Sequence, residues 1–382
     1  MMSLKSKREL VETVQPRYLK ASKTEKRKIL DEFTSATGYR RKYAIRVLKN
    51  QRQDQKHLKG KTKTYQSVYR GKVRQTLEQI WEIYGRICSK RLQPILPKAI
   101  RVLEGWQEIE FSKATKDLLL KISSASIDRC LRPVRSKLSH GLGTTKPGSL
   151  LKQFIPVRTF TEWDEERPGF MEIDLVAHCG NTTQGQYLNT LTCTDIVTGW
   201  TDVTGVLHRS QQAVSEAVRH MRQRLPFPLL GIDSDNGSEF INELMYNYCL
   251  TEKITFTRSR PYKKNDQVHV EQKNWSVVRH TVGYDRWETE QELALLESIY
   301  EDLRLYINFF QPSFKLIAKE RVGNQTLKRY DTAKTPYQRV LERKDISLEA
   351  KARLVNLYMH LNPAELRRKI DHKTARLWKL SR

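Results

Sequence analysis

The chain of 382 residues is poor in cysteine and has no long apolar run. Its five cysteines are odd in number and form no Cys-x-x-Cys pair, which argues for reduced thiols and against structural zinc. No stretch approaches the roughly eighteen apolar residues of a membrane span, and the first residues lack the apolar segment of a secretory signal. The sequence therefore predicts a soluble, cytoplasmic protein without a membrane partner.

Acidic residues are scarce and unevenly placed, with 43 Asp and Glu against 69 Lys and Arg, a net charge of +26. Residues 1–150 carry a net of +22, residues 151–310 a net of −7, and residues 311–382 a net of +11. Acidic surfaces hold a polyanion poorly, so nucleic-acid affinity is predicted in the two basic flanks. A net positive charge alone is also typical of ribosomal or membrane-surface proteins.

One acidic residue follows a short apolar run. Residues 229–232 predict a buried strand that leads to Asp235 and an Asn-Gly turn, with Ser238 as the N-cap of a helix from Glu239. Asp235 would then lie at the carboxyl end of a strand, where open α/β sheets collect ligands and catalytic groups.

Two further acids are predicted to reach the same region. Asp174 lies inside the strand-like run 170–177, where an unpaired carboxylate is costly and calls for a metal, a cation or a raised pKa. Glu271 lies on a helix whose predicted N-cap is Asn265. Two strands and a helix thus each bring one carboxylate.

The runs FMEIDLVA, SDNGSEF and NDQVHVEQ resemble the three blocks of the DDE, or integrase-core, transposases of bacterial insertion sequences, relatives of retroviral integrase. The 35 residues between Asp235 and Glu271 match the spacing of that family. The resemblance covers about residues 154–310. It implies an α/β ribonuclease H-like core, a mixed five-stranded sheet with helices, flanked by all-α helix-turn-helix DNA-binding domains and a mostly helical carboxyl region.

The resemblance also implies a function. The chain would bind the terminal inverted repeats of an insertion sequence and catalyse 3′-end cleavage and strand transfer into target DNA. Asp174, Asp235 and Glu271 would be the catalytic residues and would hold two Mg²⁺ ions, with Mn²⁺ as a substitute. Asp174 would bridge both ions. The chain would act in the bacterial cytoplasm, associated with the nucleoid.

Two neighbouring acids compete for these positions. Asp233 precedes Asp235 by two residues and could share its strand face, but Asp235 abuts the turn and carries the family spacing. Glu172 shares a strand face with Asp174 and could instead be an edge salt-bridge residue.

Helical patterns with turns predict DNA-binding segments on the amino-terminal side. Residues 24–35 and 39–49 form a helix, a Gly-containing turn and a basic helix, with Tyr43 expected on the inner side. A long helix 73–88 and a shorter one 96–103 follow, and a second helix-turn-helix spans 116–131, capped by Ser124 or Ser126. The residues expected to contact DNA are Arg40, Arg41, Lys42, Arg46, Arg129, Arg132 and Arg135, with Lys263, Lys264 and Gln267 beside Glu271. A solvated basic face is the alternative for each group.

The predicted organisation has six parts. They are a helix-turn-helix domain (1–56), a linker (57–69), a second helical DNA-binding domain (70–138), a linker (139–168), the catalytic core (169–311) and a basic carboxyl region (312–382). Within the last two parts, residues 288–310 predict a helix on the core sheet or a coiled-coil seam, and residues 314–330 a hairpin. Residues 335–380 predict helices broken near Asp345 and Pro363.

An element has two ends and each chain has one triad, so the expected partners are double-stranded DNA and a second copy, in a dimer or higher oligomer on DNA. Two other functions stay open. A ribonuclease H-like nuclease or resolvase would hydrolyse DNA without joining strands. A catalytically dead, transposase-derived regulator would bind DNA without cleaving it.

Overall fold

The computed structural model describes residues 2, 4–49, 68–136, 157–158, 167–259, 268–322 and 325–380. Contacts divide the chain into two compact units, Met1–Ser67 and Val68–Arg382. Most of both predicted linkers lies outside the described residues, as do Asn265, Lys263, Lys264 and Gln267.

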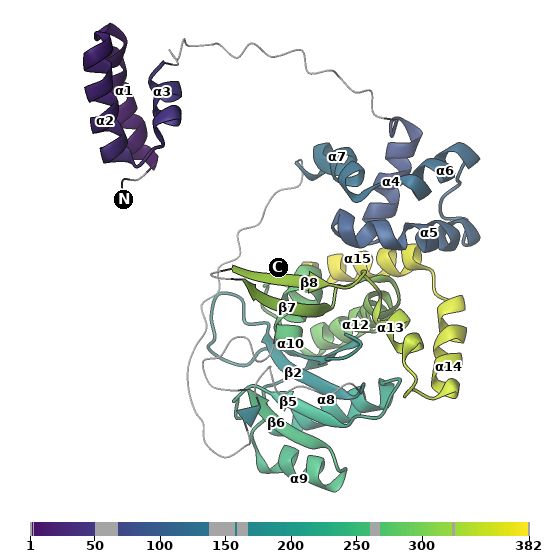
Figure 1. Cartoon of the computed structure of the whole chain (residues 1–382). Helices are drawn as coiled ribbons and strands as arrows, with labels where there is room; N and C mark the ends of the chain where they lie inside the picture. The colour runs from purple at the N-terminus through teal and green to yellow at the C-terminus, as the bar shows by residue number, and fades with distance from the viewer. Residues whose placement is uncertain are drawn as a thin grey trace. The chain divides into compact units, whose positions relative to one another are not determined.

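The first unit, purple in Figure 1, is built from three helices: α1 (Leu4–Lys20), α2 (Lys23–Thr37) and α3 (Arg41–Lys49). Ser22 and Glu25 form a capping box that begins α2, and Gly38, at φ 68°, ends it. The apolar core joins all three helices and consists of Tyr18, Ile29, Leu30, Phe33, Ala44 and Leu48.

One expectation for this unit is wrong. Tyr43 was expected on the inner side of α3, but 41% of it is exposed, because Ala44 and Leu48, one turn apart, take the inward face. The Tyr43 ring instead lies beneath the Arg46 guanidinium, 5.0 Å away.

The second unit begins with four helices, α4 (Lys72–Ile83), α5 (Ser89–Gly105), α6 (Lys113–Lys121) and α7 (Ser124–Arg135). α5 begins well before residue 96 and contains Pro94 and Pro97, because burial of its apolar face outweighs the hydrogen bonds that two prolines remove. The N-cap of α7 is Ser123, which accepts the N–H of Ser126; neither expected serine is the cap.

These helices share one apolar core with the sheet domain. The hydroxyl of Tyr306 on α12 (Glu290–Phe310) donates to the Ile83 carbonyl at 2.7 Å, and Gln311 donates to the Tyr84 carbonyl at 2.9 Å. Contacts therefore place residues 70–138 in one body with the core, and the domain boundaries at 138 and 311 remain predictions.

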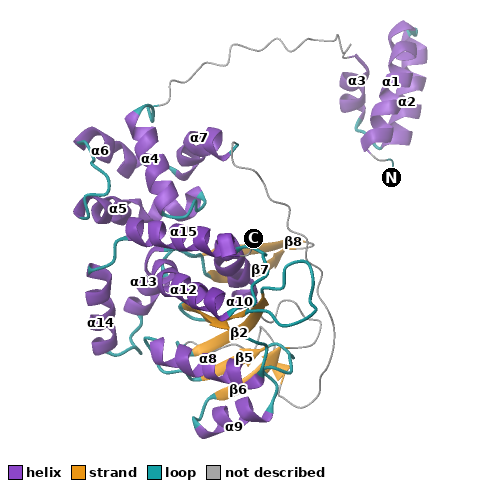
Figure 2. Cartoon of the chain, turned by 180° about the vertical axis from the view of Figure 1, so that it is seen from behind, coloured by secondary structure: helices purple, strands orange, loops and turns teal. Residues whose placement is uncertain are grey.

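The sheet has strands β1 (Val157–Arg158), β2 (Phe170–Ala177), β3 (Asn189–Asp195), β4 (Thr201–Val206), β5 (Gly231–Ser234) and β6 (Thr255–Ser259). Their order is β1-β6-β5-β2-β3-β4, and Figure 2 shows β2, β5 and β6 of this sheet in orange. The expected five strands are thus six, because the short β1, inside a predicted linker, extends the sheet beyond β6.

The pairing matches the expected core. β2, β3 and β4 are antiparallel neighbours, whereas β5 and β6 run parallel to β2. Three antiparallel strands followed by two parallel ones, with helices between them, is the ribonuclease H-like order. Parallel pairing puts the carboxyl ends of β2, β5 and β6 at one end of the sheet.

The helices between and after these strands are α8 (Gln211–Arg224), α9 (Glu243–Thr251), α10 (Val268–Lys273), η1 (Asn274–Arg279), α11 (His280–Val282) and α12. Ser210 caps α8 as expected. Ser238 is not an N-cap: α9 begins at Glu243 with Asn242 as its cap, so residues 235–242 form turns. α12 packs on β4 rather than standing free, since a Cβ at Gly205 would meet Leu293 at 2.6 Å.

The carboxyl region holds a hairpin, β7 (Leu316–Val322) and β8 (Gln325–Tyr330), and three helices, α13 (Pro336–Glu342), α14 (Leu348–Met359) and α15 (Pro363–Leu380). The predicted breaks near Asp345 and Pro363 are confirmed. α15 packs along α12. No helix among the described residues is long and apolar enough to cross a membrane.

Candidate active site

The three predicted acids come from three elements that meet at one end of the sheet. Asp174 lies on β2, Asp235 directly follows β5, and Glu271 lies on α10. β2 and β5 are parallel with Ile173 opposite Ser234, so Asp174 and Asp235 are the next positions along each strand. They project from the same face because side chains alternate along strands.

The pKa of Asp174 reflects the proximity of these acids. Burial, followed by the nearby charges of Asp235 and Glu271, raises the pKa of Asp174 to about 7. Two donors oppose that shift: the Leu175 N–H at 2.8 Å and the Asn274 side-chain amide at 2.6 Å. Three carboxylates that repel one another across a half-buried site favour a cation between them.

The pKa of Asp235 is also raised, chiefly by burial and then by the charge of Glu239. The N–H of Gly237, 2.9 Å from its Oδ1, and the Arg209 guanidinium act in the opposite direction. Asp233, the alternative, is buried and accepts the Thr257 hydroxyl at 2.8 Å. Asp235 is therefore the more open of the two aspartates.

Glu172 has a defined partner. Its side chain is 1% exposed, and Oε2 accepts the backbone N–H of Val270 on α10 at 2.9 Å. The alternative of an edge salt bridge is wrong, because β2 is a central strand and leaves no solvent-exposed edge. Burial is the main cause that raises the pKa of Glu172 to about 8, and the charges of Asp233 and Glu271 add to it. Glu172 thus fixes the helix that carries Glu271.

α10 passes directly into a π-helical segment, η1, whose first residue is Asn274. Asn274 donates to Asp174, while its own Oδ1 is buried without a partner among the described residues. Its position three residues after Glu271 could have been noticed in the sequence, because residues three apart share a helix face. His269 is half-buried and burial lowers its pKa to about 4, in agreement with the expected packing role.

Sequence reasoning missed Arg209, the cation beside the site. Its guanidinium pairs with the carboxylate of Glu239, with Nε to Oε1 at 2.8 Å. The Glu239 side chain is 4% exposed, whereas that of Arg209 is 51% exposed. In the sequence Arg209 is marked only by its place directly before the Ser210 cap, and nothing there indicates its partner. Arg209 can present its remaining N–H groups to an anion at Asp235.

The donor set fits divalent cations. Carboxylate oxygens suit Mg²⁺ and Mn²⁺. Among the described residues no three His, Cys, Asp or Glu side chains converge on one ion. Asp174, Asp235 and Glu271 are the side chains that would hold such a cation.

The other predicted residues lie on surfaces. Arg40, Arg41, Lys42 and Arg46 are exposed in the first unit, and Arg129 and Arg132 are exposed on α7. Arg135 is held by Asp128 at 2.7 Å and lies over the Trp81 ring, 5.4 Å from its centre. DNA contact by these residues remains a prediction.

The strand order and the three acids define a ribonuclease H-like core with an acidic site at one end of its sheet. The chain is 40% identical over 340 residues to the uncharacterized protein y4rM of Sinorhizobium fredii (strain NBRC 101917 / NGR234), a match that covers 88% of this chain and 96% of that protein. The chain therefore belongs to the same family as y4rM.

Two other comparisons add little. No family model matches the chain. The crystal structure of the catalytic core domain of BIV integrase matches 46% of this chain and 94% of its own, at 17% identity and a TM-score of 0.29. A TM-score this low does not establish a shared fold, whereas the strand order identifies the fold independently.

Proposed function

We propose that the chain is a DDE transposase that binds the ends of an insertion sequence, cleaves DNA at its 3′ ends and transfers those ends into target DNA. One observation carries the proposal: Asp174 on β2, Asp235 after the parallel neighbour β5, and Glu271 on α10, which contacts β2, come from three separate elements that meet at one end of the sheet. Their spacing resembles that of the integrase-core transposases.

Each residue has a role in this reaction. Asp174 is oriented by the Leu175 N–H and by the Asn274 amide, which donate to its Oδ1 and Oδ2 respectively. When bound at these acids, divalent cations would supply an activated attacking oxygen and charge for the leaving oxygen. Arg209, fixed by Glu239, offers a positive charge to a DNA phosphate beside Asp235.

The first experiment is to sequence the DNA that flanks the gene, find the inverted repeats, and build a duplex that ends at the element boundary. The full chain with Mg²⁺ is expected to release a 3′-hydroxyl and join it to a second duplex. Asp174→Asn, Asp235→Asn and Glu271→Gln should each lower both rates by at least about a hundredfold and leave DNA affinity nearly unchanged.

The outcomes separate the rival functions. Cleavage without joining of a pre-cut end would favour the nuclease or resolvase. DNA binding without any Mg²⁺-dependent cleavage would favour the catalytically dead regulator. A triad variant that keeps near-wild-type rates would remove that residue from the site.

A further inference from the structure

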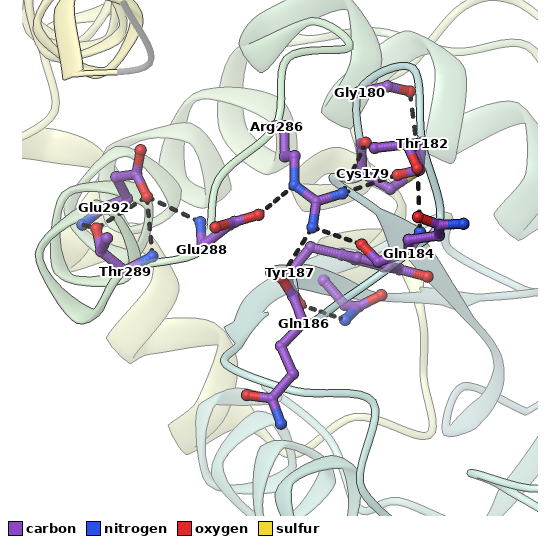
Figure 3. A network of polar contacts seen from close by, with 11 residues as sticks. Cys179, Gly180, Thr182, Gln184, Gln186, Tyr187, Arg286, Glu288, Thr289 and Glu292 are labelled. Carbon is purple, nitrogen blue, oxygen red and sulfur yellow. Dashed lines mark hydrogen bonds and ion pairs between the residues drawn. The ribbon is translucent and has the colours of Figure 1, made fainter.

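The loop Cys179–Tyr187, which joins β2 to β3, is held in shape by the side chain of Arg286 (Figure 3). The guanidinium donates to four of its carbonyl oxygens: Nη1 to Cys179 (3.3 Å) and Thr182 (2.8 Å), and Nη2 to Gln184 (2.7 Å) and Gln186 (3.2 Å). Nε pairs with Glu288, and the guanidinium lies over the Tyr187 ring at 5.5 Å. A polar surface loop is thereby given one conformation.

These hydrogen bonds, which we call the Arg286 clamp, determine the direction in which the backbone N–H groups of the loop point. In a trans peptide the C=O of one residue and the N–H of the next point in opposite directions, and the described chain has no cis peptide. The carbonyls of Thr182, Gln184 and Gln186 point inward to Arg286, so the N–H groups of Thr183, Gly185 and Tyr187 point outward. Within the described loop these three N–H groups have no hydrogen-bond partner. Alternate residues therefore present a row of donors.

The loop lies at the same end of the sheet as the acids. β2 continues only three residues past Asp174, so His178, the residue directly before the loop, lies roughly 13 Å further along the strand direction. The last residue of the loop returns to the sheet, because β3 begins two residues after Tyr187 and pairs Asn189 with Ala177 at the end of β2. The donor row thus lies beyond the acids, at the carboxyl end of β2.

A fixed row of backbone N–H groups is suited to phosphate oxygens, which accept from main-chain donors in many protein–DNA contacts. The core has a net charge of −7 over residues 151–310 and cannot hold DNA by general attraction. Local, oriented donors would supply contacts that the net charge does not. Roughly 13 Å corresponds to about four base pairs at 3.4 Å per step.

We propose that the loop Cys179–Tyr187 is a preformed subsite for the DNA phosphate backbone, about four base pairs from the phosphate that reacts at Asp174. It binds through its outward N–H groups, and Arg286 is the positioning residue that orients them. The proposal rests on the proposed function, because it takes the DNA bound at the acids as its ligand.

The test uses the full chain with Asp174→Asn, so that bound DNA is not consumed, and the element-end duplex described above. A photoreactive phenylalanine derivative is placed at position Thr183, or as a control at Leu348 on α14, which is 83% exposed. Crosslinks are expected from position 183 about four base pairs from the reacting phosphate, and none from position 348. DNA bound in a gel shift without crosslinks from position 183 would overturn the subsite alone. A chain that does not bind the duplex would overturn the proposed function as well.

A matched pair of glycine variants tests the clamp. Gly185 (φ +78°) and Gly71 (φ +52°) both have a positive φ, at which an alanine is strained. Only at Gly185 would the new Cβ meet Arg286, 3.3 Å from Nη2; at Gly71 nothing lies within 4 Å. Gly185→Ala should weaken duplex binding about tenfold relative to Gly71→Ala, as expected for lost hydrogen bonds to a charged group. Equal affinities of the two variants would contradict the proposal.

Discussion

The carboxylate of Glu172 on β2 accepts the backbone N–H of Val270 on α10 at 2.9 Å. A buried central strand thus holds the first turn of the helix that carries Glu271. An N–H group at a helix start has no partner within the helix, so a side-chain acceptor stabilises it.

We expect Glu172→Gln, which keeps an acceptor oxygen, to retain DNA cleavage within a few-fold. Glu172→Ala leaves the Val270 N–H buried without an acceptor and should lower the cleavage rate about 10- to 100-fold, as for other partners of metal ligands. Amide hydrogen exchange should accelerate in α10 in the alanine variant alone. Wild-type exchange and rate in Glu172→Ala would show that α10 is held by other contacts.

The choice between two aspartates can be decided by one comparison. Asp235→Asn should abolish Mg²⁺-dependent cleavage, whereas Asp233→Asn should mainly lower the melting temperature, because the Thr257 hydroxyl bonded to Asp233 loses a charged acceptor. Cleavage assays and thermal unfolding of both variants give the answer. An inactive Asp233→Asn beside an active Asp235→Asn would reverse the assignment.

Stability should depend on pH through the two raised carboxyl groups. The pKa values of Asp174 and Glu172 are raised to about 7 and about 8, from 3.8 and 4.5. The folded chain therefore keeps protons that the unfolded chain releases, and the unfolding free energy should fall as pH rises from about 4 to about 8. Asp174→Asn should reduce this fall. Thermal unfolding in chelator across that range measures it, and a stability that rises with pH would contradict the expectation.

Mg²⁺ should counteract the loss of folding stability at higher pH, because only ionised carboxylates bind the cation. The rise in melting temperature on adding Mg²⁺ should therefore be small near pH 5 and larger above about pH 7. Asp174→Asn, titrated in parallel, should show little rise at either pH.

Arg209→Ala should lower the rate of DNA cleavage at the site. Its guanidinium is half-exposed and fixed by Glu239, so its loss removes a positive charge beside Asp235 and leaves Glu239 buried without its cation. We expect cleavage to fall about tenfold or more, with Arg209→Lys intermediate because lysine lacks the two-nitrogen contact. Arg219→Ala on α8 is a suitable control, since that side chain lies over the Tyr248 ring of α9. Equal rates for Arg209→Ala and the control would exclude the role.

The first unit can be tested by removal. Met1–Ser67 has its own core, so a chain that begins at Val68 should keep the thermal transition of the second unit. Its affinity for the element end should fall and depend less steeply on salt, because fewer phosphates are neutralised. Arg40→Ala with Arg46→Ala in the full chain should shift affinity in the same direction. An unchanged salt dependence would place DNA binding elsewhere.

Strand periodicity, a local pattern, predicted the strand that carries Asp174 and the strand that precedes Asp235, whereas the ribonuclease H-like order of the sheet was implied by the family resemblance. The roles of Glu172 and Arg209 were not predictable, since each depends on a partner far away in the chain. The predicted N-cap at Ser238 was wrong for a related reason. The turn after Asp235 continues to Asn242, and Glu239 pairs with Arg209 instead of beginning a helix. Local capping preference gave way to a long-range ion pair.

The contacts between helices α4–α7 and α12 restrict which segments of this chain can be exchanged for those of its relatives. Tyr306 and Gln311 bond to carbonyls at the end of α4, so exchanging α4–α7 alone would break contacts within one shared core. An exchange before Val68 leaves the apolar core of each unit whole. Chimeras that borrow a new recognition unit should therefore remain folded when joined near residue 68 and misfold when joined near residue 150.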